Sequence, residues 1–173
     1  MLQSISDFLS SLHVNAFVGS HDWVWPVCEI LHFAGMAVLI GTVGVVDARI
    51  LGVGKGISIK SLERFIPLGV IAFIVNLTTG FIFVAGNTPG SPMEYLGNLS
   101  FQIKMLFVLI AGVNLLLFYV TGIAKQVDHL DANAVAPTGA KVVAVVSLVM
   151  WIGVIFMGRM IMYNDTLLYT LGL

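Results

Sequence analysis

The sequence predicts an all-α membrane protein: a four-transmembrane-helix antiparallel bundle with a short N-terminal amphipathic helix. Of its 173 residues, 58% are hydrophobic and only 10% are charged, whereas soluble domains carry roughly 25% charged residues. The mean hydropathy is +1.01. Four separate stretches each contain about 20 mostly apolar residues, the length that an α-helix needs to cross the hydrocarbon core of a bilayer. Because the connections between them are short, consecutive helices are expected to run antiparallel.

The first 22 residues are expected to form an amphipathic segment on the outer face of the membrane. Apolar side chains recur on one side of a helical projection, at Ile5, Phe8, Leu9, Leu12 and Ala16. A helix with this pattern lies in the membrane interface with its apolar side toward the lipid. Because no Lys or Arg precedes Arg49, the basic start of a cleavable signal peptide is missing, and we expect the N-terminus to remain attached.

Four spans are predicted within a bundle of residues 23–163, and they cover residues 23–46, 65–85, 105–124 and 142–163. Trp23 and Trp25 mark the interface at which the first span enters the membrane. The second and third spans contain no charged residue, and the fourth contains Arg159 only. Residues 164–173 are expected to form an outer C-terminal tail.

The basic residues predict the orientation of the bundle. Six of the eight Lys and Arg residues lie at the connections from span one to two and from span three to four: Arg49, Lys55, Lys60, Arg64, Lys125 and Lys141. The turn-rich segment 86–92 and both termini contain none. Because short loops rich in Lys and Arg stay on the cytoplasmic side, both termini are predicted to lie outside.

Four ionisable side chains in or directly beside the spans form the candidate functional site. They are Glu29 and His32 in the first span, Lys104 immediately before the third and Arg159 near the end of the fourth. A charged group inside a membrane helix costs about 2.5 to 3.5 kcal/mol on insertion scales, so it needs a partner, a water-filled pocket or a ligand. With the predicted orientation all four lie in the outer half of the membrane, where we expect one outward-facing polar pocket. Further polar groups for it are available at Asn76, Thr78, Thr79 and Asn114.

Two cations and one carboxylate leave one positive charge of this cluster without a protein partner. An anionic ligand would supply the counterion, because a buried unpaired charge is costly. One such ligand is haem b, with His32 as its axial ligand and Lys104 and Arg159 binding its propionates. A second possibility is copper, for which the soft ligands are His32, Cys28 and Met36. No other histidine lies in a predicted span, so a bis-histidine haem would need a ligand from a partner.

A structural interpretation of the same residues is the alternative. Glu29 would pair with Lys104 or Arg159 in an ion network that binds nothing, and the protein would be a non-catalytic accessory subunit of a larger membrane complex. Small residues on the first span would then contact partner subunits or a second copy of the chain: Ala37, Gly41, Gly44 and Ala48. No pattern assigns a catalytic residue. Transport has less support, because the inner halves of spans two to four offer little polar beyond Asn114 and Ser147.

The composition and the residue spacing exclude several other classes of protein and of binding site. Eight Lys and Arg residues against nine Asp and Glu residues give a net charge of −1, so the chain lacks the basic surface of a nucleic-acid-binding protein. With Cys28 as its single cysteine, it cannot form an internal disulfide or a multi-cysteine metal site. Lys55 is followed by Gly56, where a nucleotide-binding P-loop requires Ser or Thr.

Several motifs resemble a family of small, uncharacterised bacterial four-helix inner-membrane proteins. Its pattern is an aromatic residue and Pro, then Glu and His early in the first span, then Asp-x-Arg-x-x-Gly at its inner end, which here are Trp25, Pro26, Glu29, His32, Asp47, Arg49 and Gly52. The runs 101–105 and 158–163 look like other signatures of the family. With the predicted orientation, the resemblance implies a multi-pass protein of the bacterial inner (plasma) membrane with periplasmic termini. Several members have a histidine late in the third span, where this chain has Tyr119.

A more distant similarity rests on His32 and Gly35, which form a His-x-x-Gly motif. This motif resembles the first helix of the CopD-type copper-resistance membrane domain and of the HemJ-type protoporphyrinogen oxidase. The first similarity implies copper and the second implies haem b, in both cases at His32.

Overall fold

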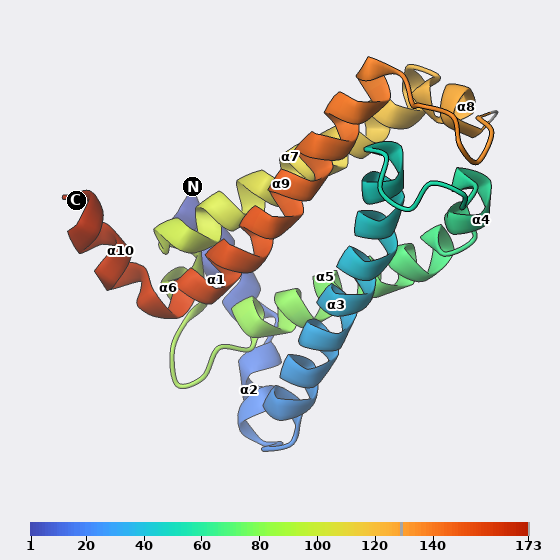
Figure 1. Ribbon diagram of the computed structural model, residues 1–173. Helices are drawn as coiled ribbons and strands as arrows, with labels where there is room; N and C mark the ends of the chain where they lie inside the picture. The colour runs from blue at the N-terminus through green and yellow to red at the C-terminus, as the bar shows by residue number, and fades with distance from the viewer. Residues whose placement is uncertain (129, 173) are drawn as a thin grey trace. The chain divides into compact units, whose positions relative to one another are not determined.

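The computed structural model describes residues 1–128 and 130–172, and in this part of the chain it contains helices and loops but no strand (Figure 1). The helices are α1 Leu2–Ser11, α2 Val14–Gly19, α3 Val24–Ile50, α4 Ile59–Glu63, α5 Ile66–Ala85, α6 Pro92–Leu96, α7 Leu99–Val120, α8 Ile123–Asp128, α9 Thr138–Met160, the 3-10 helix η1 Ile161–Tyr163 and α10 Asn164–Leu171. The predicted all-α fold is therefore confirmed.

Four helical segments are long and apolar enough to cross a membrane: Val24–Ile50, Ile59–Ala85, Leu99–Val120 and Thr138–Leu171. The prediction of four membrane helices is thus confirmed, with ends that differ by several residues from the predicted spans. The first helix continues past residue 46 through Asp47 and Arg49, and the third begins at Leu99, so that Lys104 lies inside it. At 1.5 Å per residue, α3 is about 40 Å long, enough for the hydrocarbon core and part of the headgroup region.

The helices end at residues with a local reason to interrupt them. His13, with φ of 55°, separates α1 from α2, and Gly122, with φ of 74°, separates α7 from α8. Pro137 immediately precedes α9, where the missing N–H of proline removes no helical hydrogen bond. Ser58 caps α4, because its hydroxyl accepts a hydrogen bond from the backbone N–H of Ser61 at 3.3 Å.

The expected N-terminal amphipathic helix is present as two short helices. The left-handed residue His13 puts Ala16 on α2, whereas Ile5 and Phe8 lie on α1. Helix α1 packs against α6, and its buried residue is Ser6, at 4% exposure. Ile5 and Phe8 are exposed, so the apolar side of α1 is available to a membrane surface.

The chain divides into two compact units. Unit 1 consists of Met1–Ala37, Ala72–Lys104 and Met157–Leu173, and unit 2 consists of Val38–Ile71 and Met105–Phe156. Each long helix contributes residues to both units, because the boundaries fall within α3, α5, α7 and α9. The predicted division into residues 1–22, 23–163 and 164–173 stays a prediction.

Unit 2 has an apolar core composed of Val46, Ile50, Ile59, Phe118, Ala124, Val127, Ala136, Ala140 and Ala144. Ala140 and Ala144 on α9 are fully buried, since small side chains allow neighbouring helices to approach closely. Helices α7 and α9 lie side by side in this unit (Figure 1), where the Asn114 side-chain amide on α7 donates a hydrogen bond to the Val143 carbonyl on α9 at 3.0 Å.

Arg49 joins the two loops of unit 2. Its side chain is only 3% exposed. Its Nε donates to the Ile57 carbonyl at 2.7 Å, and its Nη2 donates to the Ala132 carbonyl. The backbone N–H of Gly56 donates to the same Ala132 carbonyl at 3.0 Å. Because a buried guanidinium needs hydrogen-bond acceptors, these carbonyls stabilise Arg49, and Arg49 in turn fixes both loops.

Candidate functional site

All four residues of the predicted site belong to unit 1. Glu29 and His32 lie on α3, Lys104 lies on α7 and Arg159 lies on α9. They do not form the ion network of the structural alternative, since none of the four makes an ion pair within the described residues. Each of the four has its own set of neighbours.

His32 forms a hydrogen bond between α3 and α5. Its Nδ1 lies 2.8 Å from the Thr79 hydroxyl oxygen. That hydroxyl also lies 2.8 Å from the Val75 carbonyl, which can only accept. We assign the hydroxyl hydrogen to a carbonyl of its own helix, Val75 at 2.8 Å or Asn76 at 3.3 Å, so that the Thr79 oxygen accepts from His32 Nδ1–H. Neutral His32 then has its proton on Nδ1 and its lone pair on Nε2.

Aromatic contacts fix the orientation of the His32 ring. The half-buried imidazole meets the Phe83 ring edge to face, with 5.3 Å between centroids. Phe83 packs in turn against Trp25, at 5.2 Å between centroids. A Cβ at Gly80 would lie 3.7 Å from His32 Cε1, so glycine at this position leaves room for the ring beside α5.

Lys104 is a half-buried basic residue on α7. Gly158 on α9 flanks it, since a Cβ there would lie 3.6 Å from Lys104 Nζ. The beginning of α7 is tied to the end of α9, because the Asn98 side-chain amide donates to the Ile161 carbonyl at 3.0 Å. Lys104 and His32 both belong to unit 1, and the site that they are predicted to share stays a prediction.

Glu29 and Arg159 have other partners. Trp25 Nε1 donates to Glu29 Oε1 at 3.1 Å, and the Glu29 charge also acts on Tyr95 of α6. Arg159 Nη2 lies 3.5 Å from the Tyr163 hydroxyl, and its guanidinium lies 5.5 Å from the centre of that ring. Both charged side chains are exposed. The polar group of unit 1 thus has a half-buried part, at His32 and Lys104, and an exposed part.

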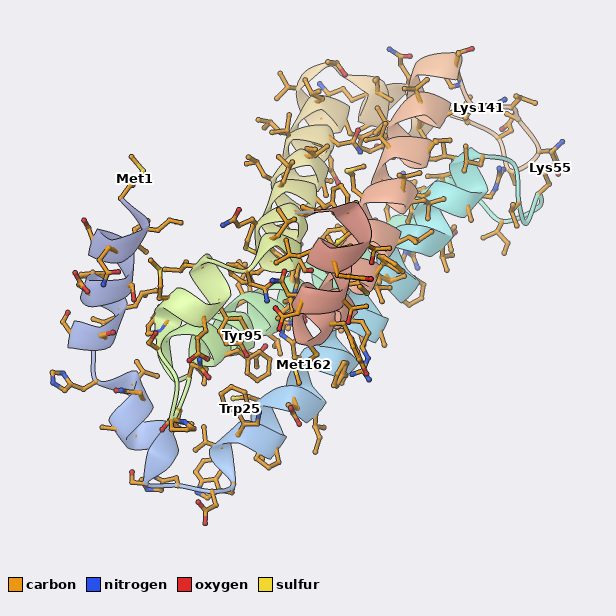
Figure 2. The ribbon with its side chains drawn as sticks, turned by 90° about the vertical axis from the view of Figure 1, so that its left-hand side faces the viewer. Met1, Trp25, Lys55, Tyr95, Lys141 and Met162 are labelled. Carbon is orange, nitrogen blue, oxygen red and sulfur yellow. The ribbon has the colours of Figure 1, made fainter. Side chains whose placement is uncertain are left out.

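Trp25 and Tyr95, both labelled in Figure 2, are partners of Glu29 that the sequence interpretation missed. The spacing of four residues between Trp25 and Glu29 is a usable signal, because such residues are neighbours on a helix surface. Tyr95 gives no such signal, since it lies in the short helix between the second and third spans. Burial, together with the carboxylates of Glu94 and Glu29, raises the pKa of Tyr95 above its ordinary value.

Asn76 contributes a buried polar atom without a partner. Its Nδ2 donates to a carbonyl of its own helix, while its Oδ1 has no hydrogen-bond partner within the described residues.

Of the other polar residues expected near the site, Thr79 binds His32. Thr78 is exposed and bonded within its own helix, and Asn114 belongs to unit 2.

The predicted copper ligands His32, Cys28 and Met36 stay a prediction, since the described part of the chain shows no other metal-binding group that would replace them. No group of three His, Cys, Asp or Glu side chains there is close enough to hold a metal ion. Cys28, at 5% exposure, is buried in an apolar cluster with Val18 and Val24. Met36 is half-buried on the next turn of α3 after His32. Packing therefore accounts for Cys28, since a free cysteine behaves as a small apolar residue.

No protein-family model, curated protein or solved structure matches this chain. A half-buried ammonium attracts an anion, and an imidazole whose Nδ1–H is held by a hydroxyl offers Nε2 as an acceptor or ligand.

Proposed function

We propose that this four-helix membrane protein binds an anionic ligand in unit 1, with Lys104 as the counter-charge and His32 as the second contact. Lys104 carries the proposal. It is a half-buried cation on a membrane helix, and it makes no ion pair with a described residue, although Glu29 lies in the same unit. Because such a charge is costly without a counterion, the carboxylate or phosphate of a ligand would complete the site.

Haem b is the ligand that would use both residues. Metal-binding histidines usually donate the N–H of their other nitrogen to the protein, and Thr79 accepts from His32 Nδ1–H in this manner. His32 Nε2 would therefore bind the haem iron, and Lys104 would bind a propionate. Bound haem would supply one-electron chemistry. The resemblance to CopD-type and HemJ-type domains agrees with His32 as the central residue, and Arg159 stays a predicted second propionate contact.

An absorption spectrum tests the haem form of the proposal. The full chain is purified in mild detergent from its native host, and a Soret band is expected. Loss of that band in His32→Ala but not in His13→Ala would assign the ligand. His13 is a suitable control because it is exposed and precedes the first membrane helix. A band that survives in His32→Ala would reject His32 as the ligand.

Native mass spectrometry tests the broader proposal. A co-purified carboxylate or phosphate compound is expected on the wild-type protein. It should be lost in Lys104→Gln and retained in Lys125→Gln, because Lys125 is an exposed lysine of unit 2. Equal retention in both variants, or the absence of any bound anion, would contradict the proposal.

Gly41 supports the alternative function, a non-catalytic accessory subunit of a larger membrane complex. This residue of α3 is exposed, and a Cβ there would meet nothing within 4 Å, so a partner helix has room to approach closely. The alternative predicts that one membrane protein co-purifies in fixed ratio and that Gly41→Leu removes it. A chain that is stable and monomeric by itself would contradict it.

We also propose that the protein lies in a bacterial inner membrane with periplasmic termini. The basic loops support this orientation, since such loops stay in the cytoplasm. A C-terminal reporter should then be active outside the cytoplasm. A reporter active only in the cytoplasm would reverse the orientation and place the Lys104 site on the other side of the membrane.

A further inference from the structure

Unit 2 contains a cavity of about 270 Å³ between its two basic loops. One wall is the segment after α3 and includes Gly52 and Lys55, and the other wall leads into α9 and includes Ala136 and Lys141. Figure 2 labels both lysines, which lie close to one another at one end of this unit. The described residues that line the cavity include no acidic side chain.

Both lysines are available to a ligand. Lys55 is exposed and Lys141 is half-buried, and neither makes an ion pair or a side-chain hydrogen bond with a described residue. Two positive charges at one cavity attract an anion. Lys141 lies in the first turn of α9, a helix of 23 residues, where the helix dipole adds partial positive charge.

The walls of the cavity are held in place by the protein itself. Arg49, through its bonds to Ile57 and Ala132, connects the two loops, and the backbone bond from Gly56 to Ala132 adds a second connection. Gly52 has a φ of 104°, a conformation that favours glycine. The cavity is therefore built by the fold and does not need a ligand to shape it.

The size and lining of the cavity indicate the class of ligand. Its volume of about 270 Å³ lies just below the roughly 300 to 1,000 Å³ of typical small-molecule pockets, so it suits a headgroup-sized anion better than a large cofactor. Ile50 and Ala136, which also belong to the apolar core, give it an apolar side. Lysine is a common phosphate-binding residue.

We propose that Lys55 and Lys141 bind a phosphate group in this cavity, either the headgroup of an anionic phospholipid or a free phosphate. The two lysines supply the positive charge, and the apolar side accepts the carbon part of a lipid headgroup. The cavity lies wholly in unit 2, so this site is independent of the Lys104 site of unit 1.

Lipid binding to the full chain tests the proposal. Native mass spectrometry measures the affinity for phosphatidylglycerol against phosphatidylcholine, and wild type is expected to prefer phosphatidylglycerol. Each lysine near an anionic headgroup contributes about 1 kcal/mol. The double variant Lys55→Gln/Lys141→Gln is therefore expected to weaken phosphatidylglycerol binding about 30-fold, which corresponds to about 2 kcal/mol at 1.4 kcal/mol per tenfold.

The matched control is Lys60→Gln/Lys125→Gln. It removes the same charge from the segments that connect the same pairs of helices, but neither lysine lines the cavity. Its affinity for phosphatidylglycerol is expected to stay within about twofold of wild type. Equal weakening in the two double variants would mean that phosphatidylglycerol is attracted by the positive charge of the surface in general. This result would overturn the proposal.

A second arm distinguishes the two sources of phosphate. In nanodiscs of phosphatidylcholine, the melting temperature is measured with inorganic phosphate or with sodium chloride at equal ionic strength. A rise with phosphate that requires Lys55 and Lys141 assigns a free phosphate, whereas a preference for phosphatidylglycerol without that rise assigns the lipid headgroup. Neither a lipid preference nor a phosphate effect would overturn the proposal.

A further variant keeps the proposal testable if the double lysine variant fails to fold. Ala134 lines the cavity and is half-buried. Ala134→Leu fills the space and leaves both lysines unchanged, so it is expected to reduce phosphatidylglycerol or phosphate binding at least tenfold. Unchanged binding in a folded Ala134→Leu protein would mean that the cavity is not the site.

Discussion

Substitution of Gly35 by alanine should disrupt the contact between α3 and α5 in unit 1. A Cβ at Gly35 would lie 2.7 Å from Asn76 Nδ2 and 3.2 Å from the Ala72 carbonyl oxygen, whereas ordinary contacts begin at 3.4 Å. The Asn76 amide must therefore move by about 0.7 Å, the difference between 3.4 and 2.7 Å. Asn76 is 7% exposed and its Nδ2 is bonded to Ala72, so it has little room to do so.

The expected cost follows from three contributions. Forcing an extra methyl group into a packed contact costs about 1 to 3 kcal/mol. Loss of the Asn76 hydrogen bond costs about 1 kcal/mol, and the better helix propensity of alanine returns about 1 kcal/mol. We therefore expect Gly35→Ala to lower the free energy of unfolding by about 1 to 3 kcal/mol.

Gly41→Ala is the matched control on the same helix. A Cβ at Gly41 would meet nothing within 4 Å, so only the gain in helix propensity remains, and the variant should be neutral or up to about 1 kcal/mol more stable. The measurement is equilibrium unfolding of both variants in mixed detergent micelles, followed by circular dichroism.

A double variant sharpens this test. Asn76→Ala removes the side chain that the new methyl group would meet, so Gly35→Ala/Asn76→Ala should recover most of the stability lost in Gly35→Ala. The reasoning is refuted if Gly35→Ala is as stable as wild type, or if Gly41→Ala is the less stable of the two single variants.

Three further predictions concern other parts of the chain. Arg49→Gln should lower the free energy of unfolding by about 3 kcal/mol in the same assay, because it loses two charge-assisted hydrogen bonds, while the exposed control Arg64→Gln should change it by less than about 0.5 kcal/mol. Thr79→Val removes the acceptor of His32 Nδ1–H, so nitrogen NMR of His32 should change from one neutral tautomer to a mixture; an unchanged spectrum would contradict the assignment. Because the pKa of Tyr95 is raised in the folded state, its contribution to stability is complete below the ordinary pKa of 10.0 and is lost as the pH rises through the higher folded pKa. Tyr95→Phe should therefore flatten the alkaline decline of stability, and an identical decline would disprove this.

The positions of the membrane helices were predictable because they depend on local composition. A run of about 20 apolar residues has to form a helix wherever it crosses lipid, since no water is present to satisfy its backbone. The helix ends were predicted less well. Residues 47–50 continue the first helix although Asp47 and Arg49 are charged, because Arg49 finds carbonyl partners in loops that the local sequence does not place beside it.

The residues of the candidate site were predictable in part, because they too stand out in the local composition. Charged residues in apolar spans are conspicuous, so Glu29, His32, Lys104 and Arg159 could be selected by composition alone. Their partners depend on helix rotation and spacing, which the sequence does not state. The ion pairs of the structural alternative do not form among the described residues, and Arg159 instead contacts Tyr163, four residues later.

The sequence by itself determined that this protein is helical and membrane-spanning, because the hydrophobic effect and the demand for backbone hydrogen bonds act on every run of residues separately. Only the tertiary structure decided that His32 of α3 is bonded to Thr79 of α5. It also decided that Lys55 and Lys141 share one cavity. These arrangements join residues from different helices or loops, and such contacts depend on packing across the fold rather than on the residues nearby in the chain.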